Sequence, residues 1–219
     1  MTDFGGWNER KDLIVLVADQ SMRLAIKGIL SRYQRLGIRQ VAGSVFELPQ
    51  AYDSETRQRC HDYLRPFLGL ADYALVIFDR EGCGSGAARE EIETEVQERL
   101  ARNGWEGCSA AVVIDPELEV WVWSDSPHVD AVLGWAPGQT QLRNWLVEQD
   151  LLQAGHQKPE HPKEALSAAL RKSKKKPSSS IFLELATSVS FDRCTDPAFQ
   201  KLKQTLQKWF PPRRREDSV

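Results

Sequence analysis

Short runs of apolar residues alternate along this chain with longer stretches in which apolar residues recur every three or four positions. Residues 13–18 (LIVLVA) form the first continuous run, and residues 22–36 follow with apolar side chains at helical spacing, ending at Gly37. A continuous run of β-forming residues indicates a strand covered on both faces, and the spacing that follows indicates an amphipathic helix. The chain therefore begins with a strand, a turn and a helix.

The same alternation continues through the first two thirds of the chain. Extended segments are predicted at residues 38–48, 73–78, 109–114 and 118–123, and helices at residues 54–68, 87–103, 129–135 and 139–151. Strands that alternate with helices at this spacing imply right-handed crossovers and a mainly parallel sheet. We therefore expect residues 1–150 to form an α/β, Rossmann-like domain.

The last third of the chain differs from the rest in charge. Residues 1–150 carry 15 Lys and Arg against 24 Asp and Glu, whereas residues 151–219 carry 14 against 7. Helices are predicted near residues 163–172, 181–190 and 197–210. We therefore expect residues 151–219 to form a basic, mostly helical extension, with a flexible loop near residues 172–180.

Composition excludes several classes of protein. With 41% hydrophobic and 27% charged residues, the chain matches globular averages, and its apolar runs fall far short of the roughly 20 residues that cross a bilayer. The first residues (MTDFGGWNERKD) lack the apolar region of a signal peptide. We expect a cytoplasmic protein without membrane association.

The cysteines indicate neither a zinc knuckle nor a disulfide framework. Cys60, Cys83, Cys108 and Cys194 lie far apart, with no CxxC pair and no paired histidines. Reduced thiols are expected. Cys83 follows a predicted strand, but the sequence pairs it with no histidine, so an incidental cysteine is favoured over a thiol nucleophile.

Acidic residues follow several of the predicted strands. Asp19 follows the first strand, Asp79 and Glu81 follow the strand at 73–78, and Glu119 lies beyond the strand at 109–114. Ligands of open parallel sheets bind outside the carboxyl ends of the strands, and converging carboxylates are relieved by a hard divalent cation. Mg²⁺ or Mn²⁺ is the expected ion. The alternative is that each acid is a helix cap or a hydrated loop residue.

Two further motifs are open to more than one interpretation. The loop at residues 82–86 (GCGSG) precedes a helix and can bring backbone N–H groups to a phosphate, but it matches neither the Walker A nor the GxGxxG pattern, which favours a simple turn. Seven tryptophans are present, and Trp121 and Trp123 are predicted to share one strand face. Such spacing marks a core edge or a surface for a protein partner.

A basic run near the start of the extension predicts contact with DNA or RNA. Lysine and arginine side chains on one strip neutralise backbone phosphates and give affinity that falls with salt. A solvated loop without a ligand is the alternative. The predicted nucleic-acid-binding residues are Arg171, Lys172, Lys174, Lys175 and Lys176.

The order of these motifs resembles a known family. The segments LVADQSM, ALVIFDREGCGSG and VVIDPELEVWVWSD are similar to the Toprim fold of topoisomerases, primases and overcoming-lysogenization-defect nucleases. More narrowly, they resemble small Toprim-like proteins of bacterial phage-defence clusters, including the methylation-associated defence system. The resemblance covers roughly residues 11–150 and implies a Toprim-like domain that works with other defence proteins.

The resemblance also implies roles for individual residues. Toprim enzymes carry a general acid/base Glu after the first strand and a metal-holding DxD pair after a later one. Asp79 and Glu81 match that pair, Glu119 completes the acidic rim, and Asp19 stands near the expected Glu. The catalytic set implied is Asp19, Asp79 and Glu81, and the metal set is Asp79, Glu81 and Glu119. The function implied is a divalent-metal-dependent nuclease of antiphage defence.

One departure from the family pattern supports a second hypothesis. Asp19 is one methylene shorter than Glu, and acid/base catalysis requires placement within hydrogen-bond reach of the moving proton. The second hypothesis is therefore a catalytically inactive Toprim-like subunit that binds a partner defence protein or nucleic acid. A nucleotide-binding regulator that uses the loop at residues 82–86 is the third.

Overall fold

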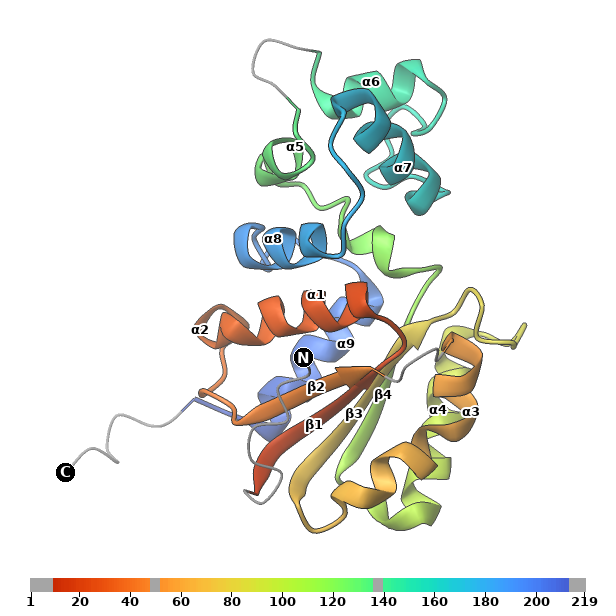
Figure 1. Cartoon of the computed structure of the whole chain (residues 1–219), viewed down its shortest axis with the longest axis vertical. Helices are drawn as coiled ribbons and strands as arrows, with labels where there is room; N and C mark the ends of the chain where they lie inside the picture. Colours follow the sequence, from red (N-terminus) through yellow and green to blue (C-terminus); the bar gives the residue numbers. More distant parts are fainter. Residues whose placement is uncertain (1–9, 48–51, 136–139, 213–219) are drawn as a thin grey trace, which may run out of the picture.

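The centre of the molecule is a four-stranded parallel sheet with helices on both faces (Figure 1). The computed structural model describes residues 10–47, 52–135 and 140–212. The strands lie in the order β2-β1-β3-β4, with bounds β1 (Lys11–Val17), β2 (Gly43–Glu47), β3 (Ala71–Asp79) and β4 (Ser109–Ile114). All three pairings are parallel. The predicted α/β class is confirmed, and the architecture is consistent with a Rossmann-like or Toprim-like fold.

The central strands are continuous apolar runs because both of their faces are covered. In β1, Leu13 and Val15 point into the core on one face of the sheet, and Ile14 and Leu16 point into the core on the other. All four side chains are almost completely buried. A strand with one solvated face would instead alternate apolar and polar residues.

The first face of the sheet is covered by helices from both ends of the chain. α1 (Gln20–Ser31) and the short α2 (Tyr33–Leu36) follow β1, and α9 (Pro197–Trp209) packs beside them against the sheet (Figure 1). α8 (Ser180–Ser188) lies on α1 as a further layer. The contact is close at Gly28, where a Cβ atom would lie 2.7 Å from the Cβ of Ala186.

The second face is covered by α3 (Asp53–Leu64) and α4 (Arg89–Leu100). The predicted helix at residues 54–68 is interrupted near Pro66: α3 ends at Leu64, and a short 3-10 helix, η1 (Arg65–Phe67), follows it. After α4 the chain makes a wide turn, η2 (Ala101–Trp105), and reverses at Gly104, whose φ is 93°. That left-handed conformation suits glycine.

Side chains of α4 occupy the outer edge of β4. Glu93 accepts a hydrogen bond from the backbone N–H of Val113 at 3.0 Å, and Gln97 accepts one from that of Ala111 at 3.4 Å. Lys201 of α9 reaches both side chains, at 2.9 Å from Glu93 and 3.2 Å from Gln97. The outward N–H groups of Ala111 and Val113 on this edge strand are therefore satisfied by α4.

A third group of helices extends beyond α8 (Figure 1). It comprises α5 (His128–Val132), α6 (Leu142–Glu148) and α7 (Pro162–Ser173). Buried residues of this group, such as Leu146 and Leu170, belong to the same apolar cluster as α1, α8 and α9. Residues on both sides of position 150 thus share one core, and the division of the chain at that position stays a prediction.

The strand expected at residues 118–123 is wrong. Residues Leu118–Trp121 form a 3-10 helix, η3, and the chain then continues toward α5. Pro116 has no N–H to donate to a ladder, and tertiary packing decides the conformation of the short apolar run that follows. Trp121 donates to Asp196 at 3.0 Å and Trp123 donates to the carbonyl of Pro162 at 3.1 Å, so the two rings do not share a strand face.

The structure also bears on the predictions about cysteines and membrane-spanning helices. The four cysteines, all of which the structure describes, are free. Within residues 10–47, 52–135 and 140–212, no helix combines the length and apolar character that crossing a bilayer requires.

Candidate functional site

The strand order has a switch point between β1 and β3. From β1 the chain crosses through α1 to β2 on one side, and from β2 it returns through α3 to β3 on the other side. Where consecutive connections leave in opposite directions, the loops separate at the carboxyl ends of the strands and a ligand can enter. Asp19 follows β1 and Asp79 ends β3, so these two predicted residues lie at the switch point.

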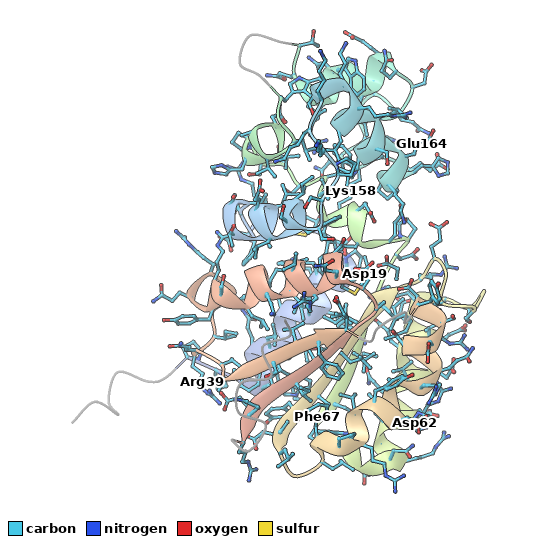
Figure 2. All side chains as sticks on the ribbon, viewed as in Figure 1. Asp19, Arg39, Asp62, Phe67, Lys158 and Glu164 are labelled. Carbon is cyan, nitrogen blue, oxygen red and sulfur yellow. The ribbon has the colours of Figure 1, made fainter. Side chains whose placement is uncertain are left out.

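Asp19 caps α1. Its Oδ1 accepts a hydrogen bond from the backbone N–H of Met22 at 2.8 Å, and its backbone is extended, as at an N-cap. The residue is exposed and lies where α1 begins, between the sheet and the upper helices (Figure 2). The cap interpretation is therefore correct for one carboxylate oxygen of Asp19, while its charge still acts on Asp53, Asp79 and Glu119.

Asp53 is a member of the site that sequence reasoning missed. It is the first residue of α3, and its Oδ1 accepts a hydrogen bond from the backbone N–H of Asp79 at 2.8 Å. Partial burial raises the pKa of Asp53, the charge of Asp19 acts in the same direction, and the N–H of Asp79 opposes both. The available signal was its place at the start of the helix after β2, which brings it to the same edge of the sheet.

Asp79 is the most perturbed group at this edge. The residue is half-buried, but its Oδ1 is inaccessible to water and has no hydrogen-bond partner among the described residues. Burial raises the pKa of Asp79 well above its ordinary value, and the charges of Asp53, Glu119 and Asp19 act in the same direction. A backbone hydrogen bond at Leu118 opposes them. The site therefore favours a proton or a cation at Asp79.

Glu117, the residue before η3, and Glu119, within η3, bring a further pair of acids to the edge, where Lys163 of α7 faces them. Burial raises the pKa of Glu119, and the charge of Glu117 adds to this. Glu117 is buried and accepts from the backbone N–H of Lys163 at 3.0 Å, at the start of α7. Burial lowers the pKa of Lys163, but the charges of Glu119, Glu117 and Asp79 outweigh it and raise the pKa overall. Glu119 thus lies close enough to act on Asp79, and its role as a metal ligand stays a prediction.

Glu81 differs from the half-buried acids of this edge in its exposure. It is exposed in the loop after β3, where its backbone N–H binds the carbonyl of Pro116 at 2.9 Å. The carboxylates with the largest influence on Asp79 are instead Asp53, Glu119 and Asp19. A ligand role for Glu81 stays a prediction.

The acids meet at one edge without forming a closed set of metal ligands. In the part of the chain that the structure describes, no three carboxylate, imidazole or thiol groups are arranged so that they could hold one ion. The edge supplies oxygen donors, the kind that Mg²⁺ and Mn²⁺ prefer, and one of these oxygens, Asp79 Oδ1, is buried and has no partner within the segments that the structure describes. The donor chemistry fits a hard divalent cation, and the side chains would have to turn toward it.

The glycine-containing loop at residues 82–86 is held by hydrogen bonds to other parts of the protein and to the residue that follows the loop. The carbonyl of Cys83 accepts from Arg57 of α3 at 3.1 Å, and Ser85 Oγ accepts from the N–H of Ala87 at 3.2 Å. Gly82 has a φ of 83°, which a turn with glycine allows. The Cys83 side chain is fully buried. These contacts favour the turn interpretation over a phosphate cradle.

The predicted basic residues differ in their surroundings. Lys175 is half-buried: its ammonium donates to the carbonyl of Val132 and lies 3.1 Å from Glu184. The other four, Arg171, Lys172, Lys174 and Lys176, are exposed.

The loop after α7, which carries Lys174, Lys175 and Lys176, returns to the acidic edge. Arg171 and Lys172 lie in the last turn of α7. Ser179 accepts a hydrogen bond from Ser21, in the first turn of α1, at 3.1 Å. Lys176 is three residues before Ser179, and three residues span at most about 10 Å of backbone. The backbone of Lys176 therefore lies within about 10 Å of that of Ser179, which contacts Ser21 near Asp19.

Most tryptophan surface is used inside the protein. Trp105, Trp123 and Trp135 are buried, and the remaining described tryptophans are half-buried. Trp135 and Trp145 pack with ring centroids 5.2 Å apart. Of the two interpretations of the tryptophans, the core interpretation holds for the three buried rings. Trp7 lies outside the described residues.

No protein-family model matches the chain, and neither a curated protein nor a solved structure matches it. What the acidic edge does must therefore be inferred from its own side chains.

Proposed function

We propose that the acidic edge binds Mg²⁺ or Mn²⁺ and that the protein is a Toprim-like, metal-dependent nuclease of prokaryotic antiphage defence. One observation carries the proposal: Asp79 has a buried carboxylate oxygen without a hydrogen-bond partner among the described residues, beside Asp53 and under the influence of Glu119. A buried carboxylate of this kind is costly unless a proton or a cation neutralises it. The resemblance of the motifs to small Toprim-like defence proteins supplies the biological setting.

The residues proposed to hold the cation are Asp79, Asp53 and Glu119, with Glu81 as the further predicted ligand. When bound, a divalent cation polarises phosphoryl oxygens and stabilises the charge that develops during phosphodiester hydrolysis. Asp19 uses Oδ1 to cap α1, so its Oδ2 is the atom available to orient a water molecule or take its proton. Lys163, which faces the same acids, adds positive charge next to a bound phosphate.

The exposed basic residues are proposed to hold the DNA or RNA backbone. Arg171, Lys172, Lys174 and Lys176 are exposed, and the loop after α7 returns to Ser21 beside Asp19. A phosphate backbone bound there would be close to the acidic edge. Lys175 contributes less to this surface because Val132 and Glu184 already engage its ammonium.

Cation binding is tested by isothermal titration calorimetry with Mn²⁺. Wild-type protein should bind saturably and Asp79→Asn should not, because the variant removes the buried charge without removing volume. Asp115→Asn is the matched control, since Asp115 is an exposed carboxylate near the same edge that pairs with Arg80 at 3.5 Å. Glu81→Gln decides whether that residue is a ligand. Equal Mn²⁺ affinity in wild type and Asp79→Asn would overturn the proposal.

Cleavage is tested separately, on plasmid and single-stranded substrates with Mn²⁺. Cleavage that both Asp79→Asn and Asp53→Asn abolish, and that Asp115→Asn leaves intact, supports the nuclease. If wild-type protein binds Mn²⁺ but cleaves neither DNA nor RNA, the nuclease part of the proposal is wrong.

A second candidate function is a non-catalytic subunit that binds a partner defence protein or nucleic acid. The engagement of Asp19 as a helix cap favours it, because the family pattern places a longer, free Glu near this position. Nucleic-acid binding without cleavage, together with Mn²⁺ binding that Asp79→Asn removes, would identify this function.

A further inference from the structure

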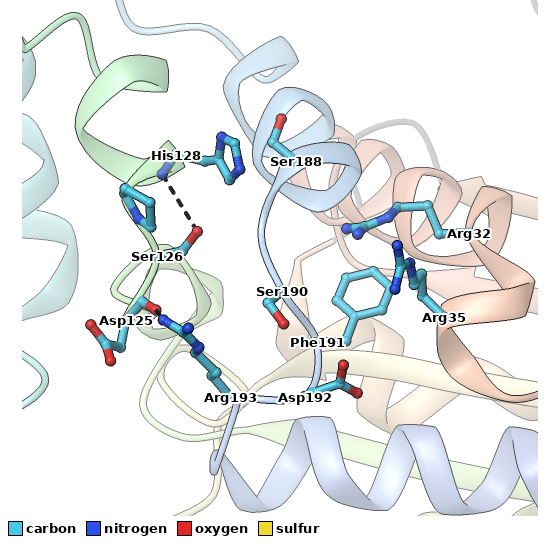
Figure 3. A pocket seen from close by; sticks show the side chains of 11 residues that line it. Arg32, Arg35, Asp125, Ser126, His128, Ser188, Ser190, Phe191, Asp192 and Arg193 are labelled. Carbon is cyan, nitrogen blue, oxygen red and sulfur yellow. Dashed lines mark hydrogen bonds between the residues drawn. The ribbon is translucent and has the colours of Figure 1, made fainter.

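A polar pocket lies at the other end of α1, remote from the acidic edge. It has a volume of about 350 Å³ and is formed by the end of α1 with α2, the segment before α5, and the connection between α8 and α9 (Figure 3). Pockets that hold small molecules begin at about 300 Å³. The volume is therefore sufficient for a small metabolite.

Three guanidinium groups line this pocket. Figure 3 shows Arg32 and Arg35 together on one wall, beside the ring of Phe191, and Arg193 on the opposite wall. Arg32 lies 4.4 Å from the centre of the Phe191 ring. Burial lowers the pKa of Arg32, and the neighbouring charge of Arg35 lowers it further, so the two cations repel each other.

The hydrogen bonds of these arginines leave their charge largely uncompensated. Arg32 donates to the carbonyls of Ala186 at 3.1 Å and Val189 at 2.6 Å, and Arg193 donates to the carbonyl of Asp125 at 3.3 Å. All of these acceptors are neutral. Within the described segments of the chain, no carboxylate lies within ion-pair distance of Arg32, Arg35 or Arg193.

The two acids of the pocket do not balance the arginines. Asp192 attracts Arg32 but is highly exposed, and it is shared with Lys203 at 3.6 Å. Asp125 is exposed and uses its backbone carbonyl, not its carboxylate, toward Arg193. Ser126, His128, Ser188 and Ser190 complete the polar lining. The pocket thus offers guanidinium and hydroxyl donors in excess of acceptors.

We propose that this pocket binds the phosphate group of a small phosphorylated ligand of mononucleotide size. One guanidinium group can donate two parallel hydrogen bonds to two oxygens of a phosphate. These bonds are charge-assisted and about twice as strong as neutral ones. A phosphate between Arg35 and Arg193 would relieve the repulsion at Arg32. The same group is found on a free nucleotide and on the 5′ end of a nucleic acid, and the test separates these sources.

The pocket and the acidic edge are distinct sites. α1 begins beside Asp19 and ends at Ser31, next to Arg32. A helix of 12 residues is about 18 Å long. The phosphate site therefore does not depend on the function proposed for the acidic edge.

The test is calorimetric titration of the full-length protein with inorganic phosphate and with adenosine monophosphate. Wild-type protein should bind both, and Arg35→Gln and Arg193→Gln should each weaken binding about tenfold, the loss expected for one charge-assisted hydrogen bond. Both residues are exposed, so these variants should keep the wild-type melting temperature. Arg65→Gln, an exposed arginine on η1, is the matched control and should bind as wild type does.

Two further arms complete the test. A short oligonucleotide with a 5′ phosphate should compete with adenosine monophosphate only if a nucleic-acid end fits the pocket, and its 5′-hydroxyl counterpart should not compete. Asp79→Asn should leave phosphate binding unchanged. The proposal is overturned if wild type binds neither probe, if binding is the same in both arginine variants, or if the 5′-hydroxyl oligonucleotide competes equally well.

Discussion

Replacing Asp79 by asparagine should stabilise the protein at neutral and alkaline pH. The carboxylate is buried beside Asp53, its Oδ1 has no partner among the described residues, and Glu119 and Asp19 add repulsion. Asparagine keeps the size of the side chain and an acceptor for the backbone at Leu118, and it removes the charge. Leaving a buried polar group unpaired costs about 1–3 kcal/mol. Asparagine also leaves a polar atom at this position, so it removes only the additional cost of the charge, and we expect the Asp79→Asn variant to gain about 1 kcal/mol of free energy of unfolding.

The sign of the pH dependence follows from the raised pKa of Asp79. Between the ordinary and the raised pKa, the folded protein holds a proton that the unfolded chain has lost, so the free energy of unfolding falls as the pH rises. In acid the protonated Asp79 of wild type and the asparagine of the variant are both neutral, so the two proteins should have the same free energy of unfolding. The difference between the two proteins should grow as the pH rises and become constant above the raised pKa.

Urea unfolding of both proteins over a pH series measures this difference. Asp53 and Glu119 also have raised pKa values, so the variant keeps part of the pH dependence, and only the difference between the two curves reports on Asp79. Asp115→Asn controls for the loss of one negative charge near the edge. A variant that is less stable than wild type at alkaline pH, or a difference that does not change with pH, would refute the reasoning.

Three other substitutions test separate contacts. Gly28→Val places atoms where Ala186 already lies and should cost about 1–3 kcal/mol of stability in urea unfolding; an unchanged midpoint would contradict this close packing. Glu117→Ala leaves the backbone N–H of Lys163 without its partner and should lower the free energy of unfolding by about 1–3 kcal/mol. Limited proteolysis should then cleave α7 faster in the variant than in wild type. Lys176→Gln should reduce the slope of log affinity for DNA or RNA against log salt by about 1, and an unchanged slope excludes a phosphate contact there.

The sheet could be predicted from the sequence because its strands carry a strong local signal. Residues 13–18 and 73–78 are apolar on both faces, which few structures other than a covered parallel strand explain. The segment at residues 118–123 shows that a local pattern alone can predict the wrong element. Its alternation is that of a strand, but Pro116 and the contacts of Trp121 and Trp123 with Asp196 and Pro162 determine its conformation. These partners lie far away in the sequence.

The acidic edge was predictable only in part, for a related reason. Asp19, Asp79 and Glu119 stand next to or beyond apolar runs, so their place at the end of the sheet follows from local pattern. Asp53 is separated from β2 by several residues, and only the order of the strands brings it to Asp79. The contact of Glu117 with Lys163 was equally invisible, because it joins segments on either side of the expected domain boundary.

The way α4 covers β4 limits how this protein can assemble. An unprotected margin of a sheet can recruit an extended segment of another polypeptide through main-chain pairing. Here Glu93 and Gln97 occupy the positions that the incoming main chain would need, and Lys201 fastens them there. A partner protein would therefore have to recognise this flank through side chains, and growth of the sheet into larger aggregates is blocked on that side.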